Sequence, residues 1–275
     1  MKYTYLIGIF LLYTGVLPSH AQKSAKGSGN LSVIDEMAND AKYLCEYDAI
    51  AWQMSDLAAT ALTPDAKMLG REWFCYQDIH QKWHGVYGKF LDTTYKVVFH
   101  YVQGEQDNID LDCNEPDSAM LFSYSKSIQK AYQMAAKLLG KSYTRFNKFL
   151  RRNADGSISI WILPAVQPGN LAVYGAEFYY QFDRNGDKLL DSNEYYRGSC
   201  KGFKLGKSRD VNLDYSDLPG VTFGSIFFAW RHREDFSTIY INTSTGSTAL
   251  KFDQQKGYHW VTGPKQPPET ASANF

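Results

Sequence analysis

Hydrophobic residues recur every three or four positions in the N-terminal part of the chain, the spacing of one face of an α-helix. Such a pattern covers residues 34–45, and an alanine-rich stretch with the same tendency covers 49–62. The second stretch ends next to Pro64, which stops a helix because it lacks a backbone N–H. A third amphipathic pattern opens at Pro116 and continues to about residue 139. The pattern therefore predicts two or three helices.

Aromatic and β-branched residues dominate the rest of the chain, and they predict strands. Residues 73–76 and 83–87 flank a polar segment and indicate a hairpin, and 93–102 (TTYKVVFHYV) is a typical strand. A second hairpin joins 146–152 to 157–163. Further strands are predicted at 173–182, 193–200, 211–215, 222–230, 238–242, 249–252 and 258–262.

This order of elements predicts an α+β fold, with two or three helices packed on antiparallel β meanders and a C-terminal half that is mostly β. We expect residues 31–275 to form a single α+β domain, with possible halves at 31–112 and 113–275. Hydrophobic residues make up 44% of the chain, enough for a sizeable core. The 20 tyrosines favour half-buried sheet, and the alternative is a stacking platform for sugars or bases.

The first segment has the pattern of a secretory signal peptide. Lys2 precedes a long apolar stretch at 5–17, and small residues at Ser19 and Ala21 predict cleavage after Ala21. Residues 1–21 are thus the predicted signal peptide, and the polar residues 22–30 a flexible leader. We expect the protein to be secreted or periplasmic. In layout the chain is similar to exported bacterial proteins, a resemblance that brings no activity with it.

Charge gives little indication of a partner. The chain has 29 basic and 29 acidic residues, and cleavage after Ala21 would remove only Lys2, giving a balance of −1. Such a chain has no long-range field to attract nucleic acid, so no nucleic-acid partner is expected. No apolar stretch after the signal peptide reaches the ~20 residues of a spanning helix, so no transmembrane segment is expected.

Four cysteines in an exported chain favour disulfides. Two bridges are expected, and three pairings are open; free thiols are the alternative. The spacing contains no CxxC pair, which argues against a zinc cluster or a redox motif. The residues are Cys45, Cys75, Cys113 and Cys200.

The run DRNGDKLLDSNE at 183–194 resembles an EF-hand calcium loop. Calcium takes six to eight oxygen ligands, and that family supplies them from positions 1, 3, 5, 7, 9 and 12 of a twelve-residue loop. The resemblance implies one bound Ca²⁺ ion. Its ligands would be Asp183, Asn185, Asp187, the main-chain carbonyl of Leu189, Asp191 and Glu194.

The same run has a second interpretation. Position 6 is Lys188, where the family has glycine, and the flanking segments are β-like instead of helical. We therefore expect any calcium loop here to lie between strands. Asn185-Gly186 between alternating stretches also predicts a tight hairpin turn, which would need no metal.

No recognised catalytic motif occurs in the chain, which argues against an enzyme but leaves a dispersed active site open. The leading hypothesis is an exported soluble protein that binds one calcium ion and has a structural or binding role. The first alternative is a glycan-binding module without a metal, which predicts aromatic side chains along one exposed face. The second is a hydrolase with a dispersed site, which predicts a pocket where two carboxylates, or a nucleophile and a histidine, converge.

Overall fold

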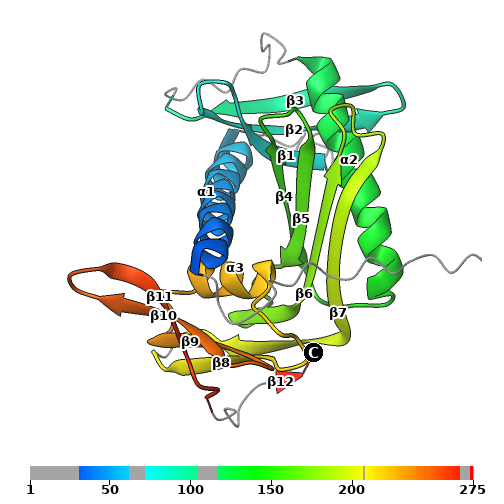
Figure 1. Cartoon of the computed structure of the whole chain (residues 1–275). Helices are drawn as coiled ribbons and strands as arrows, with labels where there is room; N and C mark the ends of the chain where they lie inside the picture. The colour runs from blue at the N-terminus through cyan, green and yellow to red at the C-terminus, as the bar shows by residue number, and fades with distance from the viewer. Residues whose placement is uncertain (1–30, 62–71, 105–116, 207, 267–272, 275) are drawn as a thin grey trace, which may run out of the picture.

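The computed structural model of the chain describes residues 31–61, 72–104, 117–206, 208–266 and 273–274. Three helices and three antiparallel or mixed sheets make up this part, and the C-terminal half is mostly strands, which confirms the predicted α+β fold (Figure 1). The predicted signal peptide and leader lie outside the described residues. None of the described helices is both long and apolar enough to cross a membrane.

Two of the three described helices are long. Helix α1 (Leu31–Ala61) packs on α3 (Phe223–Arg231), and α2 (Ser118–Leu139) packs on strands of the first two sheets. Asp117 caps α2 by accepting hydrogen bonds from two backbone N–H groups of the first turn. The helix expected from Pro116 is thus confirmed, with its described start at Ser118.

The two N-terminal stretches form one continuous helix, which settles an alternative that the pattern left open. No glycine or proline interrupts residues 31–61. The buried positions also keep the same spacing across the expected break, at every third or fourth residue. These buried residues include Ile34, Ala38, Ala41, Leu44, Tyr47, Ala51, Met54 and Ala58.

The strand predicted at 222–230 was wrong, because this segment forms α3. Its aromatic and β-branched composition is typical of a strand, but the helix is buried on several sides and so lacks a polar face. A capping box at its start, in which Thr222 and Ser225 bond each other's backbone N–H groups, directs the chain into a helix. The remaining strand predictions are confirmed within a few residues. The strand predicted at 193–200 is the longest exception, because it spans Leu189–Lys204 (β7).

The strands form three sheets, all antiparallel except for one pair. That pair, β8 and β9, is parallel because α3 forms the crossover between them. The first sheet contains β1 (Glu72–Gln77), β2 (Trp83–Leu91) and β3 (Thr94–Val102). The second contains β4 (Phe146–Arg152), β5 (Ile158–Pro164), β6 (Leu171–Phe182), β7 (Leu189–Lys204) and β12 (Ala273–Asn274). The third contains β8 (Asp210–Tyr215), β9 (Thr238–Thr243), β10 (Ser247–Asp253) and β11 (Gly257–Gly263).

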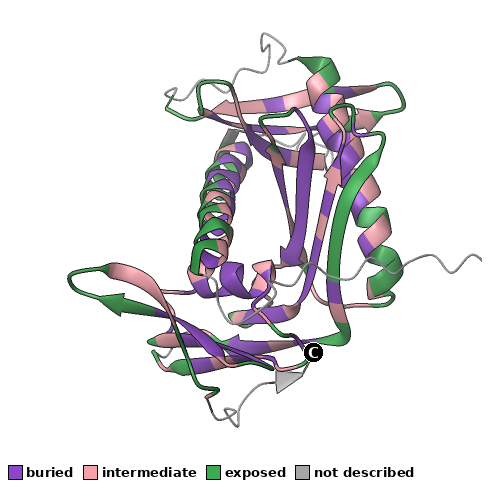
Figure 2. Ribbon diagram, viewed as in Figure 1, coloured by how far each residue is buried: buried purple, intermediate pink, exposed green. Residues whose placement is uncertain are grey.

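Strand β5 lies at the centre of the core and is buried from Ile158 to Leu163 (Figure 2). A strand buried at every residue needs cover on both faces. On one face, Phe149 of β4 contacts Tyr47 of α1 and Phe227 of α3. Helix α2 also packs against β5. Among the described residues, most aromatic side chains are buried in the hydrophobic core or packed against it, on helices as well as on strands.

The two predicted disulfides are absent from the described residues, so that prediction was wrong. Cys45, Cys75 and Cys200 are free thiols on α1, β1 and β7. Cys75 and Cys200 are buried, and burial raises the pKa of all three thiols. The three cysteines therefore act as small apolar side chains of the packed interior. Cys113 lies outside the described residues.

Candidate functional site

The calcium-loop motif forms the tight turn between β6 and β7. The N–H of Asp183 donates to the carbonyl of Lys188 at 2.9 Å, and the N–H of Gly186 donates to the carbonyl of Asp183 at 2.9 Å. Gly186 has a φ of 68°, a conformation that glycine adopts without strain. The turn is thus the hairpin that Asn185-Gly186 predicts.

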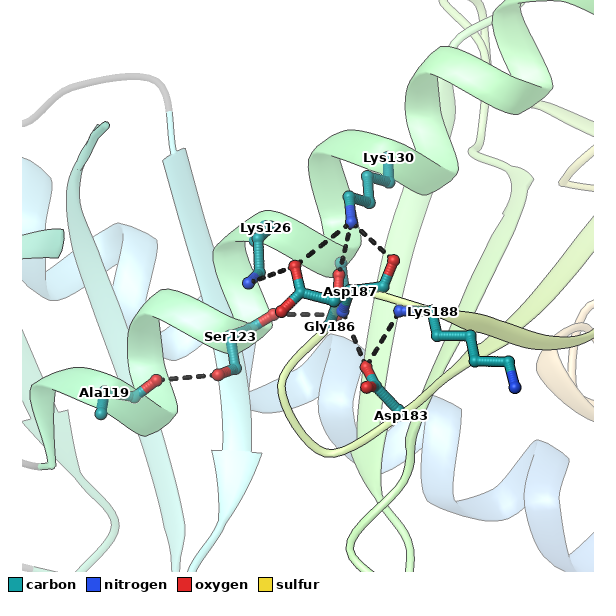
Figure 3. Close-up of polar contacts among 9 residues, drawn as sticks. Ala119, Ser123, Lys126, Lys130, Asp183, Gly186, Asp187 and Lys188 are labelled. Carbon is teal, nitrogen blue, oxygen red and sulfur yellow. Dashed lines mark hydrogen bonds and ion pairs between the residues drawn. The ribbon is translucent and has the colours of Figure 1, made fainter. Parts of the chain in front are cut away.

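Two lysines of α2 hold this turn (Figure 3). The ammonium group of Lys130 donates to the main-chain carbonyls of Gly186 at 3.0 Å and Asp187 at 2.8 Å. Lys126 donates to the Asp187 carboxylate at 2.8 Å, and Lys130 lies 3.6 Å from the same oxygen. The hydrogen bond from Lys126 and the charges of both lysines lower the pKa of Asp187. Protein ammonium groups thus bind oxygens of the kind that a metal cation takes.

The other predicted ligands bond to neighbouring protein groups. Asp183 accepts hydrogen bonds from the backbone N–H groups of Asp187 at 2.7 Å and Lys188 at 3.1 Å. Glu194 accepts one from the hydroxyl of Tyr180 at 2.6 Å. Asp191 accepts one from the N–H of Ser192 at 2.9 Å, Leu189 pairs with Phe182 in the sheet, and Asn185 is exposed at the tip of the turn.

The shape of the chain explains why these six residues do not converge. Residues 189–194 belong to β7, and a strand rises by roughly 3.3 Å per residue, so Glu194 lies roughly 16 Å beyond Leu189 along the strand. An EF-hand loop instead curves around its ion. Across the described ranges, no group of three His, Cys, Asp or Glu side chains is placed to hold a metal. Calcium binding here would require the start of β7 to leave the sheet, and it stays a prediction.

Calcium titration tests this loop directly. The motif predicts that millimolar Ca²⁺ raises the melting temperature and that the Asp183→Ala, Glu194→Ala double variant loses this rise. An unchanged melting temperature would contradict the prediction and leave the two lysines and the sheet pairing as what holds the turn. Magnesium at the same concentration is the control for ionic strength.

A second candidate site is a groove between the first turns of α1, the end of α3 and strand β11. It has room for about 400 Å³. Three aromatic side chains, Trp230, Tyr258 and Trp260, line it, and we call it the aromatic groove. Its polar residues are Asp35, Asn39, Lys42 and His259.

Contacts within the groove fix two of its three aromatic rings. Trp230 has the Lys42 ammonium and the Arg233 guanidinium each 4.9 Å from a ring centroid. Tyr258 packs edge-to-face on Trp230 at 6.2 Å, and its hydroxyl donates to the carbonyl of Arg233 at 3.3 Å. Trp260 is half-buried and has no aromatic or cationic ring partner among the described residues. One part of its side chain packs against the hydrophobic core, and the exposed part is the surface that the groove offers to a ligand.

Sequence reasoning did not identify this groove, although one signal was present. Residues two apart on a strand face the same side, so Tyr258 and Trp260 had to share a face of β11. Their cross-strand partners Phe252 and Leu250 extend that apolar face. What the sequence could not show is that α1 and α3 approach this face of the hairpin.

Comparison of the chain with models of known protein families, with curated proteins and with solved structures found no match.

Proposed function

We propose that this chain is a glycan-binding protein that holds part of a carbohydrate chain in the aromatic groove without a metal. The observation that carries the proposal is the half-buried ring of Trp260, which lines a hollow together with Trp230, Tyr258 and several polar side chains. A sugar ring has an apolar C–H face and a rim of hydroxyl groups. A groove with an aromatic floor and hydrogen-bonding groups at its edge complements both.

The size of the groove supports a small ligand. Its room of about 400 Å³ lies within the roughly 300–1,000 Å³ typical of ligand sites. The groove is a small hollow. A stable protein–protein interface instead buries a broad surface, about 800 Å² on each partner. A short stretch of sugar units fits these dimensions better than a folded partner.

The polar lining supports an uncharged ligand. Asp35 carries a negative charge and Lys42 a positive one, so the charged groups of the groove nearly cancel. The Lys42 ammonium donates to Asn39 at 3.4 Å, which joins two of these side chains along one face of α1. Such side chains can both donate hydrogen bonds to hydroxyl groups and accept them.

Tryptophan fluorescence during titration with soluble oligosaccharides tests the proposal. The probes are cello-, xylo-, malto- and chito-oligosaccharides of four to six units. We expect at least one series to quench the fluorescence and Trp260→Ala to weaken its binding by about tenfold or more, because truncating a central aromatic side chain typically costs ~2 kcal/mol. Binding should persist in excess chelator.

The matched control is Tyr143→Ala, which removes an aromatic side chain that is 98% exposed and lies outside the groove. This variant should bind like the wild type. Failure of all four series to bind, or equal binding by the Trp260→Ala variant, would refute a glycan role for the groove.

A further inference from the structure

A second hollow lies deeper in the fold, where α1 and α3 meet strands β4 to β6. Its volume is about 110 Å³, and it is separate from the aromatic groove in its lining. Part of the wall is apolar, formed by Leu163, Val173, Phe227 and Phe228. Four polar residues also line it: Asp48, Asn147, Arg231 and His232. An apolar pocket with a few polar groups is the usual composition of a small-molecule site.

Opposite charges lie side by side in this pocket. Asp48 is only 8% exposed, and its carboxylate forms an ion pair with the Arg231 guanidinium at 2.8 Å. Asn147 contributes a longer contact of 3.5 Å to the other oxygen of the carboxylate. A guanidinium has five N–H donors and a carboxylate about four acceptor positions, so the pair keeps capacity for further hydrogen bonds. Burial outweighs the effect of Arg231 and raises the pKa of Asp48.

His232 adds an acceptor to the same pocket. Its Nδ1 lies 2.8 Å from the Asp235 carboxylate, which can only accept, so Nδ1 carries the proton. Burial lowers the pKa of His232 and keeps the ring neutral near pH 7. Nε2 is then the unprotonated nitrogen of the ring, and it can accept a hydrogen bond. The histidine is thus oriented by Asp235 and can accept a hydrogen bond from a ligand.

We propose that this pocket binds a free apolar α-amino acid. The ligand's carboxylate would contact Arg231, its ammonium group Asp48 and His232, and its side chain the apolar wall. An α-amino acid carries both charges on one carbon, so it matches adjacent protein charges of opposite sign. A simple carboxylate would leave Asp48 facing a second negative charge, and a simple amine would leave Arg231 without an anion.

The volume limits the side chain. An apolar cavity of about 150 Å³ accepts benzene, so a pocket of 110 Å³ that also takes the charged groups of the ligand suits an aliphatic side chain better than an indole. Leucine is therefore the first probe. The site uses no residue of the aromatic groove, and the proposal does not depend on glycan binding.

Calorimetric titration of the whole protein with three probes tests the proposal. L-leucine should bind and raise the melting temperature. Its analogues 4-methylpentanoate, which lacks the ammonium group, and 3-methylbutylamine, which lacks the carboxylate, should each bind at least tenfold more weakly. Absence of leucine binding at millimolar concentration, or equal binding of either analogue, would overturn the proposal without any variant.

Two variants place the site. The Asp48→Asn, Arg231→Gln double variant replaces both charges by amides, which avoids leaving one buried charge unpaired. We expect it to lose at least tenfold in affinity for leucine, whereas Trp260→Ala should bind leucine like the wild type. Retained leucine affinity in the double variant would place the amino acid elsewhere and refute the pocket.

Discussion

Glu177→Gln is expected to raise the free energy of unfolding by about 3 kcal/mol at pH 8. It should also remove a fall in stability that the wild type shows as pH rises from 4.5 to about 7. Glu177 is 8% exposed on β6. One carboxyl oxygen accepts a hydrogen bond from the N–H of Gly224, and Thr222 donates another to this carboxyl. The second oxygen, Oε1, has no partner among the described residues. Burial therefore raises the pKa of this carboxyl from 4.5 to about 7.

The sign of the pH dependence follows from proton binding. Between pH 4.5 and about 7 the unfolded chain releases the proton of Glu177, whereas the folded protein keeps it. The folded state then binds more protons, so stability falls as pH rises through this window and levels off above it. Glutamine has the same shape and no charge to bury, so this loss of stability with rising pH should be absent from the Glu177→Gln variant. The full difference of about 2.5 pKa units corresponds to about 3 kcal/mol.

Urea unfolding at several pH values between 4 and 8 measures this effect. The informative quantity is the difference in unfolding free energy between the wild type and Glu177→Gln, because other titrating groups cancel in it. Glu234→Gln, at a side chain that is 75% exposed, is the control and should shift nothing. A difference that stays constant from pH 4.5 to 7 would show that Glu177 ionises normally in the folded protein.

Gly186→Ala should destabilise the protein by about 3 kcal/mol, the second large effect that we expect. A Cβ at this position would lie 2.5 Å from the Ser127 hydroxyl oxygen and 2.6 Å from the main-chain carbonyl oxygen of Ser123. Both atoms belong to α2, so the turn would have to move away from the helix. Overpacking typically costs about 1–3 kcal/mol, and the left-handed backbone adds roughly 1–2.

Gly198→Ala separates these two contributions. Gly198 also has a positive φ, 83°, and lies on the same β6–β7 hairpin, but a Cβ there meets nothing within 4 Å. We expect Gly198→Ala to destabilise the protein by about 1 kcal/mol, the cost of the left-handed backbone alone. Chemical denaturation of both variants checks the prediction. Equal destabilisation of the two would mean that the contact of the turn with α2 contributes nothing.

Much of the fold follows from local pattern, because most strands here are hairpin neighbours. Alternation and turn residues define β4 and β5 well, since Asn153-Ala-Asp-Gly156 separates two apolar stretches. Helix α3 could not be predicted from local pattern. Its environment, and not its composition, decides its structure: α1 on one side and the sheet on the other leave it no polar face.

The candidate sites were less predictable than the fold. The 183–194 motif has every side chain that a calcium loop needs, yet Lys126 and Lys130, some 60 residues earlier in the chain, reach its turn from α2. A linear motif carries no information on such a contact. The aromatic groove and the pocket likewise combine α1, α3 and later strands, which the sequence alone does not bring together.

The lysines of α2 supply the β6–β7 turn with a positive charge that cannot diffuse away. A dissolved ion is captured only when its concentration exceeds its dissociation constant. A tethered ammonium group has a fixed, high effective concentration instead. The two lysines should therefore hold the turn whether or not a dissolved metal ion is present.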